Sequence, residues 1–237
     1  MPKTDIFLFF SKEKLRFQRK KNYFCNMYYE DRCHATSAIL HQMYYINSDI
    51  DGITDEQLSA MLDALPQWRR EQAMRYKFRN GRVTCAAAFL LLRDALLKEH
   101  LITPDEEINF SISEHGKPSI LGRDDIFFNI SHCRHAVACI VGTEPCGIDI
   151  EDRGRYHDSV AQYAMNAREQ QDILQSADSD LTFTRLWTQK EAVLKCLGTG
   201  INDDMKDVLS ASGNITVQTV SHPSAPYVCS IARQRED

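Results

Sequence analysis

The chain has 237 residues, of which 43% are hydrophobic and 26% charged, a composition that disfavours disorder, collagen-like repeats and coiled coils. With about 150 residues per domain, this length predicts one to two domains. The net charge of −5 argues against a general nucleic-acid binder. The charge is uneven, because residues 1–42 carry eight Lys/Arg and four Asp/Glu, a balance of +4 that leaves −9 for residues 43–237.

Residues 1–42 are predicted to be a poorly ordered extension. Their apolar run, residues 6–10, is shorter than the apolar region of a secretory signal, which has roughly 7 to 15 residues. No stretch approaches the roughly 20 apolar residues of a membrane helix. The basic clump at 12–21 lacks clean helical periodicity, and an Arg-rich targeting peptide is the alternative. We therefore expect a cytoplasmic protein whose domain starts near Met43, and a chain shortened to begin there should stay active.

The predicted elements of residues 43–145 mix helices and strands. A strand at 43–47 precedes Thr54-Asp55-Glu56-Gln57, a capping-box pattern that begins a helix ending near Leu65. Pro66 opens a second helix, and an apolar helix at 82–100 must be buried almost all round. The periodicity then changes to that of strands, which are expected at 108–112, 126–130 and 136–142, with a turn at Gly116-Lys117-Pro118.

Residues 146–237 resemble the first half in order. A strand at 147–151 precedes helices at 166–175 and 181–197, the second closed by Gly198, and strands at 208–211, 215–220 and 227–232 follow. Two patterns recur: Arg70-Glu71-Gln72 as Arg168-Glu169-Gln170, and Ser131-His132 with Cys139 as Ser221-His222 with Cys229. We therefore predict an α+β fold of two similar halves, 43–145 and 146–237, with helices packed on antiparallel sheet. The halves are expected to form an intramolecular pseudo-dimer with a ligand site between them.

Eight cysteines raise the question of a disulfide or zinc framework. They form no CxxC pair and match no zinc-ligand spacing. Ser131-His132-Cys133-Arg134-His135 could be read as a metal or Cys/His site, but its residues alternate faces on a strand. Free thiols are therefore the prediction.

Gly147-Ile148-Asp149-Ile150-Glu151 places two carboxylates on one face of a predicted strand. Adjacent carboxylates repel each other, and a cation between Asp149 and Glu151 would relieve the repulsion. Oxygen ligands of this kind suit Mg²⁺ or Mn²⁺. The alternative is an exposed edge strand with two solvated acids.

The helix at 181–197 contains Trp187-Thr188-Gln189-Lys190-Glu191-Ala192-Val193-Leu194-Lys195. Glu191 and Lys195 are four residues apart and share a helix face. Glu191 could supply a third carboxylate to a metal, and Lys195 could neutralise a bound phosphate. The alternative is a weak surface ion pair, but the apolar neighbours indicate a mostly buried helix.

The strand that ends in Ser131-His132 can offer a hydroxyl and an imidazole to phosphate oxygens. Lys117, held in its Gly/Pro turn, can add a fixed positive charge. Taken alone, His132 is more often structural than a ligand.

In four segments the chain closely resembles the 4'-phosphopantetheinyl transferase superfamily: Gly116-Lys117-Pro118, Asn129-Ile130-Ser131-His132, residues 147–151 and residues 187–195. The length and the apparent duplication resemble its surfactin-synthetase-activating branch, in which one chain forms a pseudo-dimer. The resemblance covers residues 43–237 and leaves residues 1–42 unmatched.

The resemblance implies Mg-dependent transfer of 4'-phosphopantetheine from coenzyme A to a serine of an apo acyl or peptidyl carrier protein, with release of 3',5'-ADP. It implies that Asp149, Glu151 and Glu191 bind Mg²⁺, with Mn²⁺ as an alternative metal. Glu191, or a water on the metal, would take the serine proton, and Lys195 would contact the phosphates. The other residues implied to contact coenzyme A are Arg69, Arg75, Arg82, Lys117, Ser131 and His132.

The implied partners are coenzyme A and the carrier protein, without nucleic acid or membrane, and a monomer is expected. Gln72 departs from the family pattern at a position that can be basic, which makes the assignment of Arg69 and Arg75 to the 3'-phosphate provisional. Cys133 stands where serine is frequent, and the role of Lys190 stays open.

Two other classes compete with this function. A non-catalytic module that binds coenzyme A or a carrier protein is disfavoured by the intact Asp149, Glu151, Glu191 and Lys195. A metal-dependent nucleotide phosphohydrolase is permitted by the same residues. Mass spectrometry after incubation with Mg²⁺, coenzyme A and an apo carrier protein would separate the three.

Overall fold

The computed structural model describes residues 42–154, 156–200 and 203–235. The predicted extension, residues 1–42, lies outside these ranges except for Gln42. Gln42 Nε2 donates to Glu144 O (3.1 Å), and Gln42 O accepts from Arg233 Nη2 (3.0 Å). The described chain therefore starts at a residue bonded to both halves.

Each half contains a long helix, a sheet and shorter helices. The first half comprises β1 (Met43–Asn47), α2 (Asp55–Ala64), α3 (Gln67–Met74), α4 (Arg79–Lys98), β2 (Phe110–Ile112), β3 (Pro118–Ile120), β4 (Phe127–His132) and β5 (Val137–Gly142). The second comprises β6 (Cys146–Asp152), α5 (Asp158–Ala164), α6 (Ala167–Gln175), α7 (Ser179–Leu197), the 3-10 helix η1 (Asp203–Lys206), α8 (Val208–Ala211), β7 (Ile215–Thr219) and β8 (Tyr227–Gln234).

The two three-stranded sheets repeat one topology. Their strand orders are β1-β5-β4 and β6-β8-β7, and every pairing is antiparallel, from Met43 opposite Val141 in the first to Cys146 opposite Arg233 in the second. In each sheet the last strand of the half lies in the centre. The β2-β3 hairpin is an addition to the first half. The prediction of two similar α+β halves is therefore confirmed.

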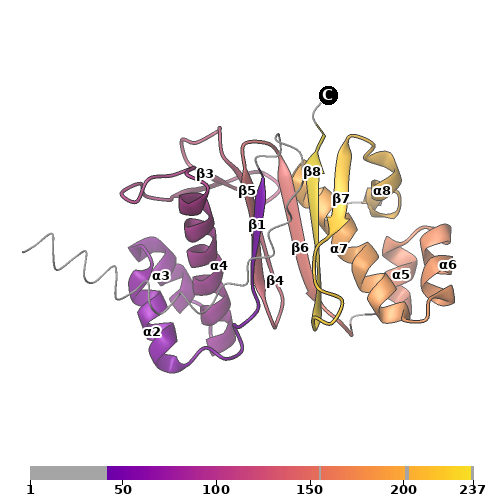
Figure 1. Ribbon diagram of the computed structural model, residues 1–237, viewed down its shortest axis with the longest axis horizontal. Coiled ribbons are helices and arrows are strands. Elements are labelled where there is room, and N and C mark those ends of the chain that lie inside the picture. Colours follow the sequence, from indigo (N-terminus) through magenta and orange to yellow (C-terminus); the bar gives the residue numbers. More distant parts are fainter. Residues whose placement is uncertain (1–41, 155, 201–202, 236–237) are drawn as a thin grey trace, which may run out of the picture.

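The two sheets lie next to each other between the two sets of helices (Figure 1). Alternation along β5 explains this arrangement, because Val137 and Cys139 pack in the core that contains α4, whereas Ala138 and Ile140 pack against the second sheet. Ile148 and Ile150 of β6 meet them there. The opposite face of β6, which carries Asp149, is therefore turned toward α7.

Capping residues mark the starts of α2 and α6 and the end of α7. Thr54 and Gln57 form the predicted capping box of α2, and Asn166 caps α6 with Glu169 in the same way. Gly198, at φ 75°, ends α7 in the left-handed conformation. The helix predicted at 82–100 instead spans Arg79–Lys98.

Four short elements differ from the prediction. Residues 208–211 were expected to form a strand, but this prediction is wrong, since they form helix α8. Helix α5, strand β3 and the 3-10 helix η1 were not predicted. Each of the four is at most seven residues long, and periodicity does not separate helix from strand over so few residues.

The recurring residue patterns do not mark equivalent positions. Cys139 packs beside α4, whereas Cys229 packs between the two sheets. Glu71 is exposed, whereas Glu169 is buried. The two halves share their order of elements, but the recurring residues do not occupy structurally equivalent positions in it.

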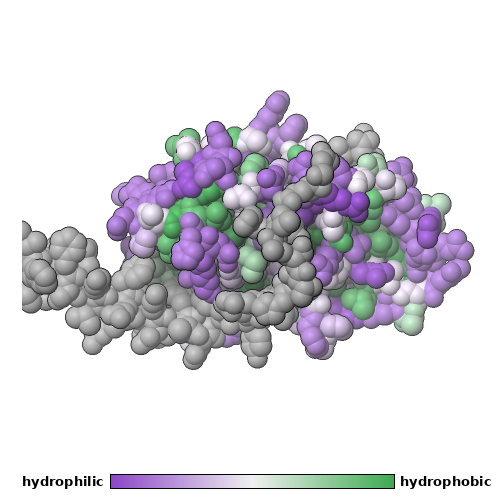
Figure 2. Space-filling model, turned by 45° about the horizontal axis from the view of Figure 1, so that its top comes forward, coloured by the Kyte–Doolittle hydropathy of each residue, from purple (hydrophilic) through white to green (hydrophobic). Residues whose placement is uncertain are grey.

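Six cysteines of the described chain are free and buried: Cys85, Cys133, Cys139, Cys146, Cys196 and Cys229. Burial raises the pKa of Cys146 to about 12, which keeps the thiol protonated. In the residues that the structure covers, no helix has the length and apolar character needed to cross a membrane. The face in Figure 2 is largely hydrophilic, with apolar surface in separate patches.

Candidate active site at the junction of the halves

Strand β6 approaches α7 so closely that its second residue has no room for a side chain. A Cβ atom on Gly147 would lie 2.0 Å from Ala192 O and 2.5 Å from Cys196 N, far inside van der Waals contact with helix backbone. Glycine is therefore required here. The close approach brings Asp149, on the same face of the strand, within reach of α7.

Asp149 receives polar contacts from two other elements. The residue is 3% exposed, and its Oδ1 accepts from Lys195 Nζ of α7 (2.6 Å) and from Ser131 Oγ of β4 (2.9 Å). Its Oδ2 is buried and has no hydrogen-bond partner among the described residues. The structure thus brings three predicted site residues together and leaves one carboxylate oxygen unpaired.

Glu191 lies one helical turn before Lys195 and is also buried. Burial raises the pKa of Glu191, the neighbouring Asp149 raises it further, and Lys195 partly opposes both. A carboxylate with a raised pKa holds a proton more readily than an exposed one. The position therefore suits proton transfer.

Two of the three predicted metal ligands line different cavities. Glu191 lines a cavity between the halves, whereas Glu151 is half-buried and lines one inside the second half. Within the described ranges, no group of three or more His, Cys, Asp or Glu side chains is arranged to hold a metal ion. Lys195 neutralises Asp149 in this arrangement, and a metal held by the three acids stays a prediction.

A cavity of about 550 Å³ lies in the first half and reaches the end of β4. Much of its wall is aromatic or apolar and includes Trp68, Tyr76, Phe110 and Ile130. Its polar lining residues include Arg69, Gln72 and His132. Arg69 Nη1 donates to Gln72 Oε1 (2.7 Å), and its guanidinium lies 5.9 Å from the centre of the Trp68 ring. Burial lowers the pKa of His132, as does the charge of Lys195, and Asp149 partly opposes them.

A second cavity of about 270 Å³ continues toward α7 and shares Gly116, Pro118 and Ile130 with the first. Lys117 and Lys195 both line it. Lys117 Nζ donates to Cys196 O (3.1 Å), near the helix end where unpaired carbonyls concentrate negative charge. Residues of both halves therefore meet in this cavity.

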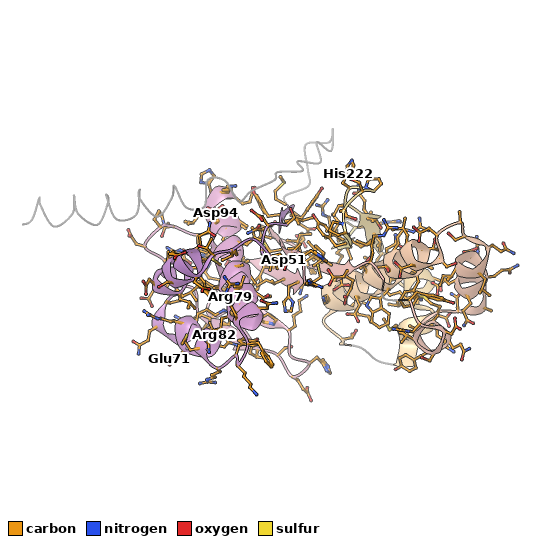
Figure 3. The ribbon with its side chains drawn as sticks, turned by 90° about the horizontal axis from the view of Figure 1, so that it is seen from below. Asp51, Glu71, Arg79, Arg82, Asp94 and His222 are labelled. Atoms are coloured by element: carbon orange, nitrogen blue, oxygen red, sulfur yellow. The ribbon has the colours of Figure 1, made fainter. Side chains whose placement is uncertain are left out.

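Two predicted arginines are absent from the lining of both cavities in the described chain. Arg75 is exposed at the C-terminal end of α3. Arg82 Nε donates to Tyr76 O (3.0 Å) in the first turn of α4, on the part of the first half that also carries Arg79 and Glu71 (Figure 3). Contacts of Arg75 and Arg82 with a ligand stay a prediction.

Known proteins match both halves. A family described as the 4'-phosphopantetheinyl transferase superfamily matches residues 145–234, and one described as 4'-phosphopantetheinyl transferase, N-terminal, matches residues 53–144. The 4'-phosphopantetheinyl transferase psf-1 of Bacillus pumilus is 32% identical over 165 residues, which cover 68% of this chain and 70% of that protein. The chain belongs to the 4'-phosphopantetheinyl transferase superfamily. A transferase of Bacillus subtilis is 29% identical over 174 residues (69% of this chain, 77% of that protein), and Sfp of Bacillus subtilis (strain 168) is 25% identical over 181 residues (74% and 80%).

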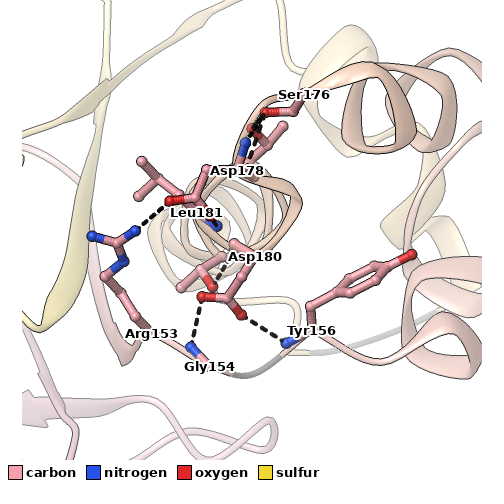
Figure 4. A network of polar contacts seen from close by, with 9 residues as sticks. Arg153, Gly154, Tyr156, Ser176, Asp178, Asp180 and Leu181 are labelled. Atoms are coloured by element: carbon pink, nitrogen blue, oxygen red, sulfur yellow. Dashed lines mark hydrogen bonds and ion pairs between the residues drawn. The ribbon is translucent and has the colours of Figure 1, made fainter.

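The chain is thus a 4'-phosphopantetheinyl transferase, as predicted. In this transferase a polar network fixes the segment after β6 against the start of α7 (Figure 4). Asp180 accepts from Gly154 N (2.6 Å) and Tyr156 N (3.1 Å), and Asp178 caps α7 while it pairs with Arg153. The network borders a cavity of about 380 Å³ whose lining includes Glu151, Phe183 and Trp187. Glu151 of β6 therefore shares this cavity with residues of α7.

Two residues near the candidate site received no role from the sequence. Asn129 Oδ1 accepts from Ile148 N (3.0 Å), which ties β4 to β6. Lys190, whose role the sequence left open, is 0% exposed and pairs with Glu169 Oε2 (2.8 Å). Its Nζ also donates to Met205 O and Lys206 O, so Lys190 is a structural residue. In the sequence, this structural role is indicated by the position of Lys190 among residues of a helix that is predicted to be mostly buried.

Proposed function

We propose that this transferase moves the 4'-phosphopantetheine group from coenzyme A to a serine of an apo acyl or peptidyl carrier protein, in the presence of Mg²⁺, and releases 3',5'-ADP. The observation that carries the proposal is the meeting of Asp149, Glu191 and Lys195 at the junction of the halves, beside the two joined cavities. An ammonium group and a basic carboxylate next to a roomy cleft suit phosphoryl transfer, which needs charge neutralisation and a proton acceptor.

Coenzyme A is proposed to occupy the two joined cavities. The aromatic wall around Trp68 and Tyr76 fits a nucleotide base, and Arg69 beside it offers a charge to a phosphate. Lys117 and Lys195 would then neutralise the pyrophosphate in the smaller cavity. His132, at the border of this region, would donate a hydrogen bond to a phosphate oxygen.

The acids of the second half fit a divalent cation. Asp149 Oδ2 is buried and has no partner among the residues that the structure describes, an arrangement that a cation would satisfy. Asp149, Glu151 and Glu191 are proposed to hold Mg²⁺, because hard oxygen donors are its usual ligands. When bound, the ion supplies positive charge to the phosphate oxygens.

In the proposed reaction, the serine Oγ of the carrier protein bonds to the β-phosphorus of coenzyme A while the bond from that phosphorus to the bridging oxygen breaks. The bridging oxygen leaves with 3',5'-ADP. Glu191 takes the serine proton, because it lines the cavity proposed for the pyrophosphate together with Lys195. Lys195, held beside Asp149, stabilises charge on the phosphates.

We further propose that residues 43–145 and 146–237 act as the two halves of one pseudo-dimer and that the enzyme works as a monomer. The repeated strand order supports this, as does a cleft that takes Lys117 from one half and Lys195 from the other. The carrier protein would bind where its serine reaches Glu191.

Mass spectrometry tests the proposal. The enzyme is incubated with Mg²⁺, coenzyme A and an apo carrier protein, and the expected result is a gain of the phosphopantetheine mass on the carrier and the appearance of 3',5'-ADP. A carrier whose target serine is replaced by alanine is the control and should gain no mass. Breakdown of coenzyme A without modification of any carrier would overturn the proposal.

A further inference from the structure

Asn129 of β4 holds the neighbouring strand with only one of the two polar atoms of its side-chain amide. Its Oδ1 accepts from Ile148 N of β6 (3.0 Å). A backbone N–H can only donate, so this bond fixes the assignment of the amide atoms: the oxygen faces β6, and the nitrogen occupies the other branch of the planar group. The direction of Nδ2 is therefore set by the contact between the two halves.

The amide nitrogen of Asn129 carries two protons, and neither is donated to an acceptor in the ranges that the structure describes. The residue is 5% exposed, so water has little access to it. A nearly buried donor without an acceptor is costly, and polar groups in such positions normally have a partner. The structural bond of Asn129 is made by Oδ1, so Nδ2 is available to a ligand.

The surroundings of Asn129 indicate the chemical class of that ligand. Asn129 lines the smaller cavity, and so do Lys117 and Lys195. Two ammonium groups favour an anion, and an amide N–H requires an acceptor oxygen. Phosphate oxygens meet both requirements.

We propose that Asn129 Nδ2 donates a hydrogen bond to a non-bridging oxygen of the coenzyme A pyrophosphate in the smaller cavity. This inference rests on the proposed function, which assigns the pyrophosphate to that cavity. The amide is neutral and held by β6, so it adds direction without adding charge to the two ammonium groups. Donors that are fixed before the ligand arrives stabilise charge on the phosphate with little reorganisation.

Nuclear magnetic resonance of the isotope-labelled full-length enzyme tests the contact directly. N129D removes the two amide protons and so identifies the side-chain signals of Asn129 in the wild-type spectrum. On addition of coenzyme A and Mg²⁺, without a carrier protein, we expect these signals to move downfield, as amide protons do when they bond to phosphate oxygens. Unchanged Asn129 signals in an enzyme saturated with coenzyme A would overturn the inference.

Calorimetry under the same conditions separates the two bonds of Asn129. N129D keeps an acceptor for Ile148 N but has no donor, and N129A has neither. Both variants should raise the Kd of coenzyme A by about tenfold to a hundredfold, the effect of losing a hydrogen bond to a charged group. An unchanged Kd in N129D would mean that Asn129 acts only through Ile148. An unchanged Kd in N129A would mean that the donor is irrelevant, and either result contradicts the inference.

The matched control is N214D, which makes the same change at an exposed asparagine that does not line either cavity in the described chain. Its Kd for coenzyme A should stay within about twofold of wild type, because water and salt screen an exposed charge. A wild-type enzyme that binds no coenzyme A would remove the proposed function together with the inference. An enzyme that modifies the carrier protein while the Asn129 signals stay unmoved would remove the inference alone.

Discussion

The two long helices occupy the same place in their halves but bury different kinds of side chain. Helix α4 begins at Arg79 and α7 at Ser179, and each covers one sheet. At equal distances from these starts, α4 has Leu90, Leu91 and Ala95 where α7 has Lys190, Glu191 and Lys195. A buried charge is costly unless it is paired, so α7 must take partners from α6, β6 and β4, whereas α4 needs only apolar neighbours.

The strands beneath the two helices show the same contrast. Tyr45 of β1 packs in the core beside α4, and its hydroxyl bonds to Glu99. Asp149 of β6 faces α7 and bonds to Lys195. The first half thus supplies an apolar core and an aromatic cavity. The second half carries the buried charged residues, which lie against the first half. Duplicated architecture allows one copy to carry the reactive groups because the other copy supports it.

Among substitutions that remove the charged groups of the second half, the largest expected effect is on transfer activity. Glu191→Gln removes the proton acceptor without a change of shape and should lower transfer by about 10³-fold or more. Its thermal stability should stay the same or rise, since burial disfavours the ionised carboxyl. The control in the first half is Glu99→Gln, which should keep transfer within about twofold. Transfer by Glu191→Gln at the wild-type rate would exclude Glu191 as the base.

The next largest effect is on stability, and it is measured by comparing position 190 of α7 with position 90 of α4. Lys190→Met leaves the buried Glu169 without its charged partner, which should lower the free energy of unfolding by about 3–5 kcal/mol. Leu90→Met, at the matching position of α4, should cost less than about 1.5 kcal/mol. Urea unfolding of both variants measures the difference. Similar losses in the two would mean that the Lys190 pair does not stabilise α7 through its charge.

The third effect concerns the close packing of β6 on α7. Gly147→Ala places a Cβ atom 2.0 Å from Ala192 O, so strand and helix must separate, at a cost of about 1–3 kcal/mol or more. Transfer activity should fall as well, because Asp149 moves with the strand. Gly213→Ala is the control, since its Cβ would meet nothing within 4 Å. Thermal unfolding and activity assays check both, and a Gly147→Ala enzyme with unchanged melting temperature would refute the packing argument.

The smallest effect is a pH dependence at the contact between His135 of the first half and Asp152 of the second. Burial opposes ionisation of Asp152, but hydrogen bonds from His135, Cys133 and Arg134 N outweigh it and lower its pKa. This stabilisation is present above the unfolded pKa of about 3.9 and is lost as pH falls through the lower folded pKa. Asp152→Asn should therefore destabilise the protein by less than about 1 kcal/mol at pH 7.

The measurement for Asp152 is urea unfolding from pH 7 down to pH 3, with Asp124→Asn, a change at an exposed acid, as the control. The difference between wild type and Asp152→Asn should shrink toward pH 3. A difference that stays constant over this range would mean that ionisation of Asp152 contributes nothing to the contact.

Prediction from the sequence succeeded where signals are local. The capping box at Thr54 predicted a helix start, and Gly198 predicted a helix end. It failed at 208–211, where four residues carry too little periodicity. For the site, spacing identified Asp149, Glu191 and Lys195, since residues two apart on a strand or four apart on a helix share a face. Spacing could not show that Arg75 points outside the cavity lining or that Asn129 joins two sheets, because both depend on contacts between distant segments.

The sequence by itself determined the family, the two-half architecture and the charged residues that lie near one another. Motif order and short-range periodicity are sufficient for these, because they depend on neighbouring residues. The tertiary structure decided how the charges are paired: Lys195 with Asp149, Lys190 with Glu169, and Ser131 between the halves. The physical reason is that burial makes each charge depend on partners 18 to 64 residues away in sequence, and only the packing of α7 on β6 and of β6 beside β4 selects those partners.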